Sequence, residues 1–444
     1  MYPKTRLTRP IRRLIMCGLI LIYAIIAPLV IFYTAGYRYN FQDRAIKQTG
    51  VLSVDIKPKN ALVYLNDVLL NQNLPIYLPN RAPGSYKIRL TLPGYKNWEK
   101  DILIESKKTA YIKNITLFKE SLPTQAMEKY FKPIANVLFS PTAVYFIMVG
   151  KNENTQEIDL VNTGDFSIQP IWRGKSNIEP IISWSPFNDF AFIKTSADGA
   201  ESIQLLNAAD LTLNKTYNFP RKISGVQWSE NATEPTLFLE TDNQIVSIDT
   251  KERKNLIKTE SDVWYVKSEN EIWLAIAEKE IASYDSNGIQ TKKIQLRDEV
   301  KKIIDINQSR VITGDGQNIN ATLLENGASQ NVITTPTQNV FFNSKTKEWL
   351  AWSPWELWSI YEDGKAALLN RTSEKINLVL PLDDYGVLLL ASENKITGFN
   401  PGYYVTHELL NNTLIEQIAV DTTRRLIFFF GEVGQKRGLF ELEY

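Results

Sequence analysis

The sequence predicts a mainly β chain, in which an N-terminal transmembrane helix precedes a small β-sandwich and a β-propeller. Three observations support this fold class. A long run without any charged residue stands near the N-terminus, at 14–37. Alternating strand patterns punctuated by Pro-Gly turns follow at 49–118. From residue 134 onward, short strands recur with a period of about 38 residues, and no long helical pattern interrupts them.

The uncharged run, LIMCGLILIYAIIAPLVIFYTAGY, is long enough to cross a bilayer, since about 20 apolar residues suffice. The segment before it is basic, and no acidic residue precedes Asp43. By the positive-inside rule, residues 1–13 lie in the cytoplasm and the chain after the span lies outside. The residues of this topology signal are Lys4, Arg6, Arg9, Arg12 and Arg13. An aromatic belt at the outer interface is expected from Tyr33, Tyr37, Tyr39 and Phe41.

A cleaved signal peptide is the alternative interpretation of this run. The run exceeds the usual apolar core of about 7–15 residues, and no clear A-x-A site follows it. A lipoprotein signal does not fit either, because Cys17 stands at the start of the apolar run and not after it. We therefore expect an uncleaved signal anchor, in which Cys17 is an apolar membrane residue.

The composition argues against several functional classes. The 50 basic and 49 acidic residues nearly balance, so the charge gives no reason to expect nucleic acid as a partner. With one cysteine and one histidine, His407, neither a disulfide within the chain nor a structural zinc site is expected. We expect no catalytic residues, no metal and no cofactor, and therefore a protein that is not an enzyme.

The segment 49–118 has the pattern of a small all-β module. Strands are predicted at 51–56, 61–65, 86–92, 100–104 and 111–118, with turns at Pro83-Gly84 and Pro93-Gly94. The arrangement resembles the PEGA domain. The residues that carry the resemblance are Pro58, Ala61, Tyr64, Pro83, Gly84, Tyr86, Gly94 and Tyr95. The family is similar to surface-layer modules, and the resemblance implies an extracytoplasmic role in a bacterial or archaeal cell envelope without enzymatic activity.

The rest of the chain is repetitive. EIWLAIAEKEIASYDSNG (271–288) aligns without a gap on KEWLAWSPWELWSIYEDG (347–364), and the shift between the two segments equals two repeat units. Four short strands in about 40 residues are typical of a propeller blade. The stretch WSPFNDFAFI (184–193) resembles the TolB-type propeller repeat.

Eight propeller units are predicted, with seven as the alternative if the first or last unit is not a full blade. They begin near residues 134, 178, 223, 260, 300, 338, 374 and 413. Because the last unit ends after three strands, residues 121–132 are expected to supply its fourth strand and to close the ring. The predicted domains are therefore a cytoplasmic segment 1–13, a membrane helix 14–37, a stalk 38–48, a PEGA-like domain 49–118, a linker 119–133 and a propeller 134–444.

WLAWSPWELWSI (349–360) spaces four tryptophans three residues apart. The repeat alignment places Trp349 and Trp352 in a second strand and Trp358 in a third strand, where packing between blades is expected. Trp355 falls on the hairpin between these strands, where the aligned unit has Lys279. Trp355 is therefore the candidate ligand contact.

Two functions remain open from the sequence. The first is a membrane-anchored, non-catalytic envelope protein that binds a cell-wall, surface-glycan or protein partner. The second is an extracytoplasmic polysaccharide hydrolase or lyase that uses carboxylates in the propeller channel. The adjacent pair Asp383-Asp384 is a weak candidate for such chemistry, because neighbouring residues of a strand point apart.

Overall fold

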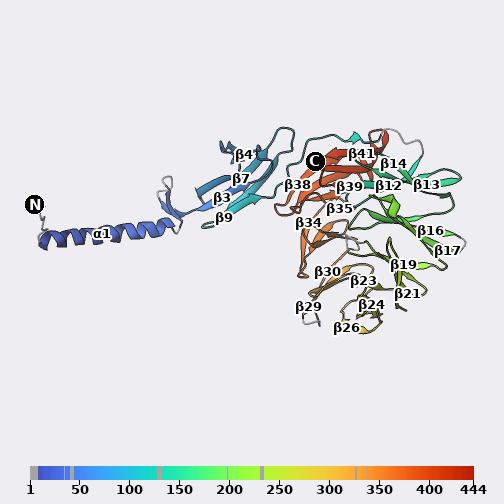
Figure 1. Ribbon diagram of the computed structural model, residues 1–444. Helices are drawn as coiled ribbons and strands as arrows, with labels where there is room; N and C mark the ends of the chain where they lie inside the picture. Colours follow the sequence, from blue (N-terminus) through green and yellow to red (C-terminus); the bar gives the residue numbers. More distant parts are fainter. Residues whose placement is uncertain are drawn as a thin grey trace, which may run out of the picture. The chain divides into compact units, whose positions relative to one another are not determined.

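The computed structural model describes residues 9–34, 36–40, 45–127, 133–197, 199–230, 235–325, 328–337 and 339–444. The chain divides into two compact units, unit 1 (Met1–Lys119) and unit 2 (Glu120–Tyr444) (Figure 1). The described residues form one α-helix, one 3₁₀ turn (η1, Leu211–Leu213) and many short strands, which confirms the mainly β fold class.

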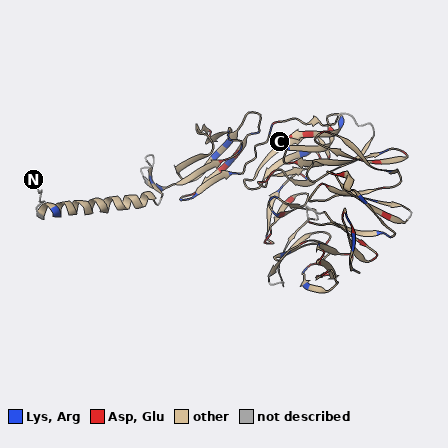
Figure 2. Cartoon of the chain, viewed as in Figure 1, with Lys and Arg blue, Asp and Glu red and all other residues tan. Residues whose placement is uncertain are grey.

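Helix α1 (Arg9–Thr34) is the apolar segment of unit 1. It is long and apolar enough to cross a membrane, and its most apolar part buries no residue inside the protein. Basic side chains stand only at its N-terminal end (Figure 2). The helix begins at Arg9, earlier than the predicted Leu14, with Pro10 in the first turn, where a missing N–H breaks no intrahelical bond.

The helix also ends earlier than predicted, at Thr34 instead of Tyr37. Gly36 adopts a φ of +81°, and its N–H donates to the carbonyl of Tyr33 at 3.2 Å. A glycine in this left-handed conformation ends many helices, because it turns the chain without a Cβ clash.

The segment 38–48 was predicted as a stalk, and the structure forms a β-hairpin there. Strand β1 (Tyr37–Asn40) pairs antiparallel with β2 (Ala45–Gln48). Tyr and Ile have high strand propensity, and the short segment has no other element to pair with. Phe41, expected in the aromatic belt, lies outside the described residues.

The rest of unit 1 is a two-sheet β-module. One sheet has the order β6 (Ile76–Arg81), β3 (Gly50–Asp55), β9 (Thr109–Lys113), and the other the order β5 (Val68–Leu69), β4 (Leu62–Leu65), β7 (Gly84–Thr91), β8 (Trp98–Ile104). Burial alternates along β3 and in the second half of β7, so that each sheet has one buried face. Trp98 is 1% exposed and is among the largest fully buried side chains.

The described residues of unit 2 form eight four-stranded sheets, which follow one another in a ring in chain order (Figure 1). The first four are β11 (Ile134–Phe139), β12 (Tyr145–Lys151), β13 (Thr155–Asn162), β14 (Ile168–Lys175); β15 (Ile181–Trp184), β16 (Phe190–Ala197), β17 (Ala200–Asn207), β18 (Lys215–Phe219); β19 (Ile223–Trp228), β20 (Leu237–Thr241), β21 (Gln244–Ile248), β22 (Arg253–Lys258); and β23 (Trp264–Ser268), β24 (Glu271–Ala277), β25 (Glu280–Tyr284), β26 (Gln290–Gln295).

The next three are β27 (Lys302–Ile306), β28 (Arg310–Gly314), β29 (Ile319–Glu325), β30 (Ala328–Thr335); β31 (Asn339–Asn343), β32 (Glu348–Trp352), β33 (Glu356–Ile360), β34 (Ala366–Arg371); and β35 (Leu378–Pro381), β36 (Leu388–Ala391), β37 (Lys395–Asn400), β38 (Val405–Asn411). The last is β10 (Thr124–Gln125) with β39 (Leu414–Asp421), β40 (Leu426–Val433) and β41 (Lys436–Glu443). The first strand of each sheet begins at or just after a predicted unit start.

The sheets pack face to face through shared apolar clusters. One cluster joins Phe192 and Leu205 of the second sheet to Leu237 and Leu239 of the third. Middle strands covered on both faces are continuous apolar runs, as in Phe428-Phe429-Phe430, where no side chain exceeds 1% exposure. This stacking of four-stranded antiparallel sheets around a channel is a β-propeller.

The ring closes through β10, which precedes the first sheet and pairs with the last strand, β41. Ala126 N–H donates to the carbonyl of Leu439 at 2.9 Å, and the Ser121 hydroxyl donates to the carbonyl of Glu443 at 2.5 Å. On the other side of the closure, the first strand β11 lies beside β39. The closing strand thus lies inside the predicted segment 121–132, of which 128–132 lie outside the described residues.

Replacing Ala126 with proline should destabilise unit 2, because proline removes the N–H that bonds Leu439. The expected loss is about 1–3 kcal/mol of unfolding free energy. Nine of the ten tryptophans belong to unit 2, so tryptophan fluorescence in urea reports this unit. Leu122→Pro is the matched control, since Leu122 is 85% exposed and outside the strand. Equal unfolding midpoints for the two variants would contradict closure through β10.

Candidate functional site

A large cavity of unit 2 lies on the axis of the ring. It has a volume of about 1180 Å³, and every one of the eight sheets lines it. Each sheet contributes the end of its first strand or the turn into its second strand. One lining residue from each sheet, in chain order, is Ser140, Phe187, Glu230, Lys267, Asp305, Lys347, Pro381 and Asp421. The cavity is therefore the mouth of the propeller channel, on the face of these turns.

A second cavity of about 420 Å³ continues the channel, and residues of five of the sheets line it. Phe187, Glu230, Phe341, Phe342 and Trp349 line both cavities. Phe342 and Trp349 form a ring pair with centroids 5.2 Å apart. The channel wall thus combines aromatic and charged side chains, a lining typical of ligand sites.

The innermost strands are joined to one another around this channel. The indole N–H of Trp184 donates to the carbonyl of Leu138 at 2.8 Å. The side chain of Gln227 bonds both the N–H and the carbonyl of Val266, at 3.0 and 3.1 Å. The ammonium of Lys267 donates to the carbonyl of Ile306 at 2.7 Å. These hydrogen bonds from side chains to backbone groups join neighbouring sheets along the channel wall.

Asp305 forms a buried ion pair with Arg310 and also accepts a hydrogen bond from Trp349. One of its oxygens accepts from Arg310 Nη2 at 2.8 Å and from the indole N–H of Trp349 at 2.9 Å. Arg310, only 3% exposed, also donates to the carbonyl of Tyr361. A charge buried this deeply is stable only while its partner is present. The Asp305–Arg310 pair therefore joins the β27–β30 and β31–β34 sheets.

Glu230 accepts a hydrogen bond from the phenol of Tyr265. Burial raises the pKa of Tyr265 above its ordinary value, and the carboxylates of Glu230 and Asp305 raise it further. The phenol therefore stays protonated and acts as a hydrogen-bond donor. It does not serve as a general base near neutral pH.

Asp421 and Arg424 form a second ion pair, with 2.5 Å between Oδ2 and Nε. Arg424 also donates to the carbonyl of Thr163 at 3.0 Å, so this pair joins the last sheet to the first. After these pairings, four charged side chains of the lining have no ion-pair partner among the described residues: Glu230, Lys267, Lys347 and Glu362. Of these, Glu230 accepts from the Tyr265 phenol and Lys267 donates to the carbonyl of Ile306. The channel mouth therefore offers unpaired charge of both signs.

Trp355, the ligand contact predicted from the sequence, lies outside the channel. It is 52% exposed in the turn between β32 and β33. Its carbonyl accepts from Thr372 N–H at 3.0 Å, and the carbonyl of Pro354 accepts from Ile376 N–H at 2.8 Å. The hairpin thus lies against the connection to the next sheet, on the face opposite the channel mouth. The ligand role of Trp355 stays a prediction.

The acidic pair Asp383-Asp384 does not form a joint site. Asp383 accepts the backbone N–H groups of Tyr385 and Val387 and so shapes its own turn. Asp384 forms an ion pair with Lys345 at 2.9 Å. His407 lies in the outer strand β38. Among the residues that the structure describes, no group of three His, Cys, Asp or Glu side chains is arranged to hold a metal.

The PEGA-like motif residues take structural positions in unit 1. Ala61 is buried, and the guanidinium of Arg89 lies 4.2 Å from the centre of the Tyr64 ring. The Tyr86 hydroxyl donates to the carbonyl of Ala82 at 2.9 Å, just before Pro83-Gly84. Gly94 has a φ of +78°, which makes a turn possible before Tyr95. Pro58 follows β3 in the loop to β4.

Of the topology signal, Lys4 and Arg6 lie outside the described residues. Arg9 begins α1, and Arg12 and Arg13 are exposed on its first turns. Their position agrees with a basic flank at one end of the apolar span.

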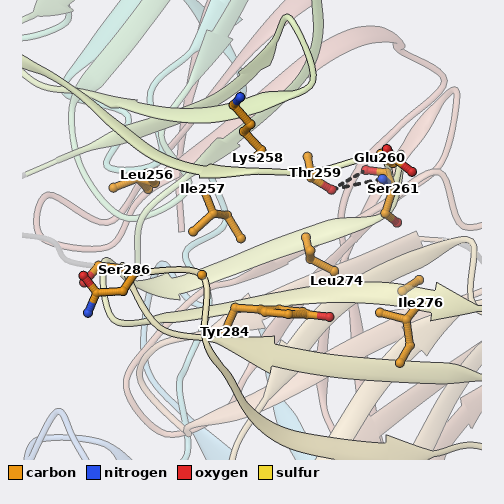
Figure 3. A pocket seen from close by; sticks show the side chains of 13 residues that line it. Leu256, Ile257, Lys258, Thr259, Glu260, Ser261, Leu274, Ile276, Tyr284 and Ser286 are labelled. Carbon is orange, nitrogen blue, oxygen red and sulfur yellow. Dashed lines mark hydrogen bonds between the residues drawn. The ribbon is translucent and has the colours of Figure 1, made fainter.

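A further groove, of about 680 Å³, runs between the β19–β22 and β23–β26 sheets (Figure 3). Ile257 and Lys258 of β22 line it from one sheet, and Leu274 of β24 and Tyr284 of β25 line it from the other (Figure 3). Ile257, Leu274 and Tyr284 belong to the cluster that packs these two sheets together. The groove is therefore an incompletely filled interface between blades.

Sequence reasoning did not identify the channel residues. Part of their signal was present, because some of them stand at or just after the end of a first strand whose start the repeat located. Aligning the ends of all first strands, with the two residues that follow, would have collected Glu230, Lys267 and Asp305.

Comparison with protein families gives one match. A PEGA domain model matches residues 49–120, which is one module of the chain. A comparison with curated protein sequences gave no match.

Similar solved structures include three that each cover about two thirds or more of this chain. The Dos1 propeller has 12% identity and a TM-score of 0.46, covering 73% of this chain and 94% of its own. The β-propeller domain of Myceliophteria thermophila Cps50 (Swd1) has 11% identity and a TM-score of 0.35, covering 72% and 99%. The uncharacterized protein lmo1340 from Listeria monocytogenes EGD-e has 10% identity and a TM-score of 0.43, covering 65% and 98%.

Replacing Arg310 with methionine should strongly destabilise unit 2, because Asp305 would keep a buried charge without its cation. The expected cost is about 3–5 kcal/mol. Lys347→Met is the control, since Lys347 is exposed and without an ion-pair partner among the described residues; its effect should stay within about 0.5 kcal/mol. Urea unfolding followed by tryptophan fluorescence measures both. A small effect of Arg310→Met would show that the ion pair is not structural.

Proposed function

We propose that this chain is a membrane-anchored, non-catalytic cell-envelope protein of the bacterial type, whose PEGA and propeller domains bind a partner outside the cytoplasm. The candidate partners are a cell-wall polymer, a surface glycan and another envelope protein. The observation that carries the proposal is the channel mouth of about 1180 Å³, which all eight sheets build. The PEGA match and the TolB-type sequence motif of the propeller favour the envelope setting.

Helix α1 supports the membrane anchor, and the basic residues before it support an N-terminus inside and C-terminal domains outside. In this arrangement both β-domains work in the extracytoplasmic space. The uncharged span and its basic flank act together as the signal anchor.

Among the partners, a polypeptide segment fits the channel mouth best. Lys347 and Glu362 offer opposite charges that have no ion-pair partner among the described residues. A neutral glycan would pair with neither, and an anionic glycan would leave Glu362 facing a like charge. A peptide can carry a carboxylate, an ammonium group and apolar side chains for Phe341 and Phe342.

The competing function is a polysaccharide hydrolase or lyase that uses the channel carboxylates. The channel does contain acids, but Asp305 and Asp421 are held by arginines and Glu230 holds a phenol. A glycosidase needs one carboxyl free to give a proton and another free to attack or activate water. Release of soluble sugar from wall glycan, lost in Glu230→Gln, would favour the enzyme over the binding protein.

Partner capture tests the binding function. Full-length protein, purified in detergent, is incubated with cell-wall sacculi and with extracts of envelope proteins. We expect one envelope protein to be retained, and retention to fall at least about tenfold for Lys347→Glu, since one lost ionic contact at a binding site costs about 1.4 kcal/mol or more.

Trp355→Ala is the control for the opposite face and should leave capture unchanged. If Trp355→Ala alone lost capture, the binding site would lie on the face of Trp355 and not at the channel mouth. Retention of sacculi instead of protein would identify the wall polymer as the partner. Recovery of no partner at micromolar concentrations would contradict the binding function.

Protease digestion of spheroplasts tests the orientation. Protease added outside should remove the β-domains and leave a membrane-bound fragment that contains α1. Protection in intact spheroplasts, with digestion only after lysis, would place the domains in the cytoplasm.

A further inference from the structure

We propose that the β1–β2 hairpin is a membrane-interface element, in which Tyr39 and Ile46 enter the headgroup layer and the net positive charge of residues 37–48 attracts lipid phosphates. The inference rests on the part of the proposed function that puts α1 across the membrane. It adds a second contact between the chain and the lipid, next to the span.

Chain length places the hairpin at the interface. The part of α1 from Leu14 to Thr34 belongs to the uncharged run. At the helical rise this part extends about 31 Å, which matches a hydrocarbon core of about 30 Å. Tyr37 follows Thr34 closely in the chain and so lies at most about 11 Å further along. The interfacial layer is about 5–8 Å thick on each side. The root of the hairpin therefore lies within or next to this layer.

Side-chain contacts fix the root of the hairpin to the end of the helix. Arg38 Nη1 donates to the carbonyls of Tyr33 and Tyr37, at 2.7 and 2.8 Å. Its guanidinium lies 3.7 Å from the centre of the Tyr33 ring. The rings of Phe32 and Tyr37 meet edge to face, with centroids 5.4 Å apart. The hairpin therefore cannot swing away from the helix end without breaking these contacts.

The strand register gives the hairpin two different faces. Arg38 pairs with Lys47, so their side chains share one face. Tyr39 pairs with Ile46 on the other face, and they are 51% and 59% exposed. Aromatic rings and apolar side chains beside basic ones are the composition of interfacial segments.

The charge of the hairpin fits phosphate. Residues 37–48 contain three basic residues and one acidic residue, so 3 − 1 gives a net charge of +2. Basic residues next to a membrane span attract anionic lipids, with about 1 kcal/mol for each. An exposed Tyr–Ile pair would lose free energy in water, and at the end of a membrane helix the lipid is the nearest surface to cover it.

Fluorescence quenching in lipid nanodiscs tests this inference on the full chain. In a Cys17→Ser background, one cysteine is introduced at Ile46 or, independently, at Tyr39, and labelled with an environment-sensitive dye. Lipids that carry a quencher near the headgroup should quench both labels about as strongly as a label at Tyr33. A label at Ile289, which is 62% exposed in unit 2, is the water-exposed control and should be quenched least.

Quenching of the Ile46 label should increase when the nanodisc contains anionic lipid, and Lys47→Gln should reduce that increase. Labels at Ile46 and Tyr39 quenched no more than the label at Ile289 would overturn the inference. A label at Tyr23, in the middle of α1, separates this outcome from failure of the anchor. Deep quenching at Tyr23 with none at Ile46 leaves the anchor standing and refutes the interfacial hairpin, whereas no quenching at Tyr23 refutes the anchor itself.

Discussion

The closure of the ring by β10 and β41 is the constraint on which unit 2 depends. Thr124 and Glu441 are 317 residues apart in the chain and meet in one sheet. Stacked sheets that did not meet would leave the outer faces of the first and last sheets, and their apolar side chains, in water. A further contact secures the closure, since Arg424 donates to the carbonyl of Thr163 in the first sheet. On its other side, the last sheet is held to the seventh, because the hydroxyl of Tyr444 donates to the carbonyl of Leu382 at 2.6 Å. The strand β10, before the first blade, and the last strand, β41, thus pair in one sheet and close the ring.

The channel exists only because the ring is closed. Some of its charged residues hold the wall together, and others are exposed at its mouth. Asp421 with Arg424 and Asp305 with Arg310 join neighbouring sheets, so their carboxylates are part of the wall. Lys347 and Glu362 are exposed at the mouth and join no sheets. Binding can therefore act through the exposed pair without disturbing the buried ones. A mechanism with two carboxylates would need, besides Glu362, a carboxylate that now holds a structural partner, and removing that partner is costly for a buried charge.

Most of this fold could be predicted from the sequence repeat, because each blade packs four strands in the same order. The first strands were located closely, and the even spacing of the tryptophans divided as expected, with Trp349 and Trp352 in β32 and Trp358 in β33. The hairpin at 37–48 was missed, since its strands are too short for a periodic pattern to be recognised. The channel pairs were missed for another reason. Asp305 and Arg310 are close in sequence, but the third partner, Trp349, comes from the next blade, and no local pattern encodes contacts between blades.

Aspartates in the tight turns of unit 2 stabilise the backbone of those turns. Asp315 accepts from the side chain of Asn318 and from the N–H groups of Gln317 and Asn318, and these hydrogen bonds lower its pKa to about 2. Asp285 and Asp363 accept backbone N–H groups two residues on in the same way. Each carboxylate replaces a missing strand partner for the backbone of its turn. A chain built from so many short strands needs many such turns, and these aspartates serve the fold. Lys347 and Glu362, at the channel mouth, are required by no ion pair and no contact between sheets, which is why the proposed binding is assigned to them.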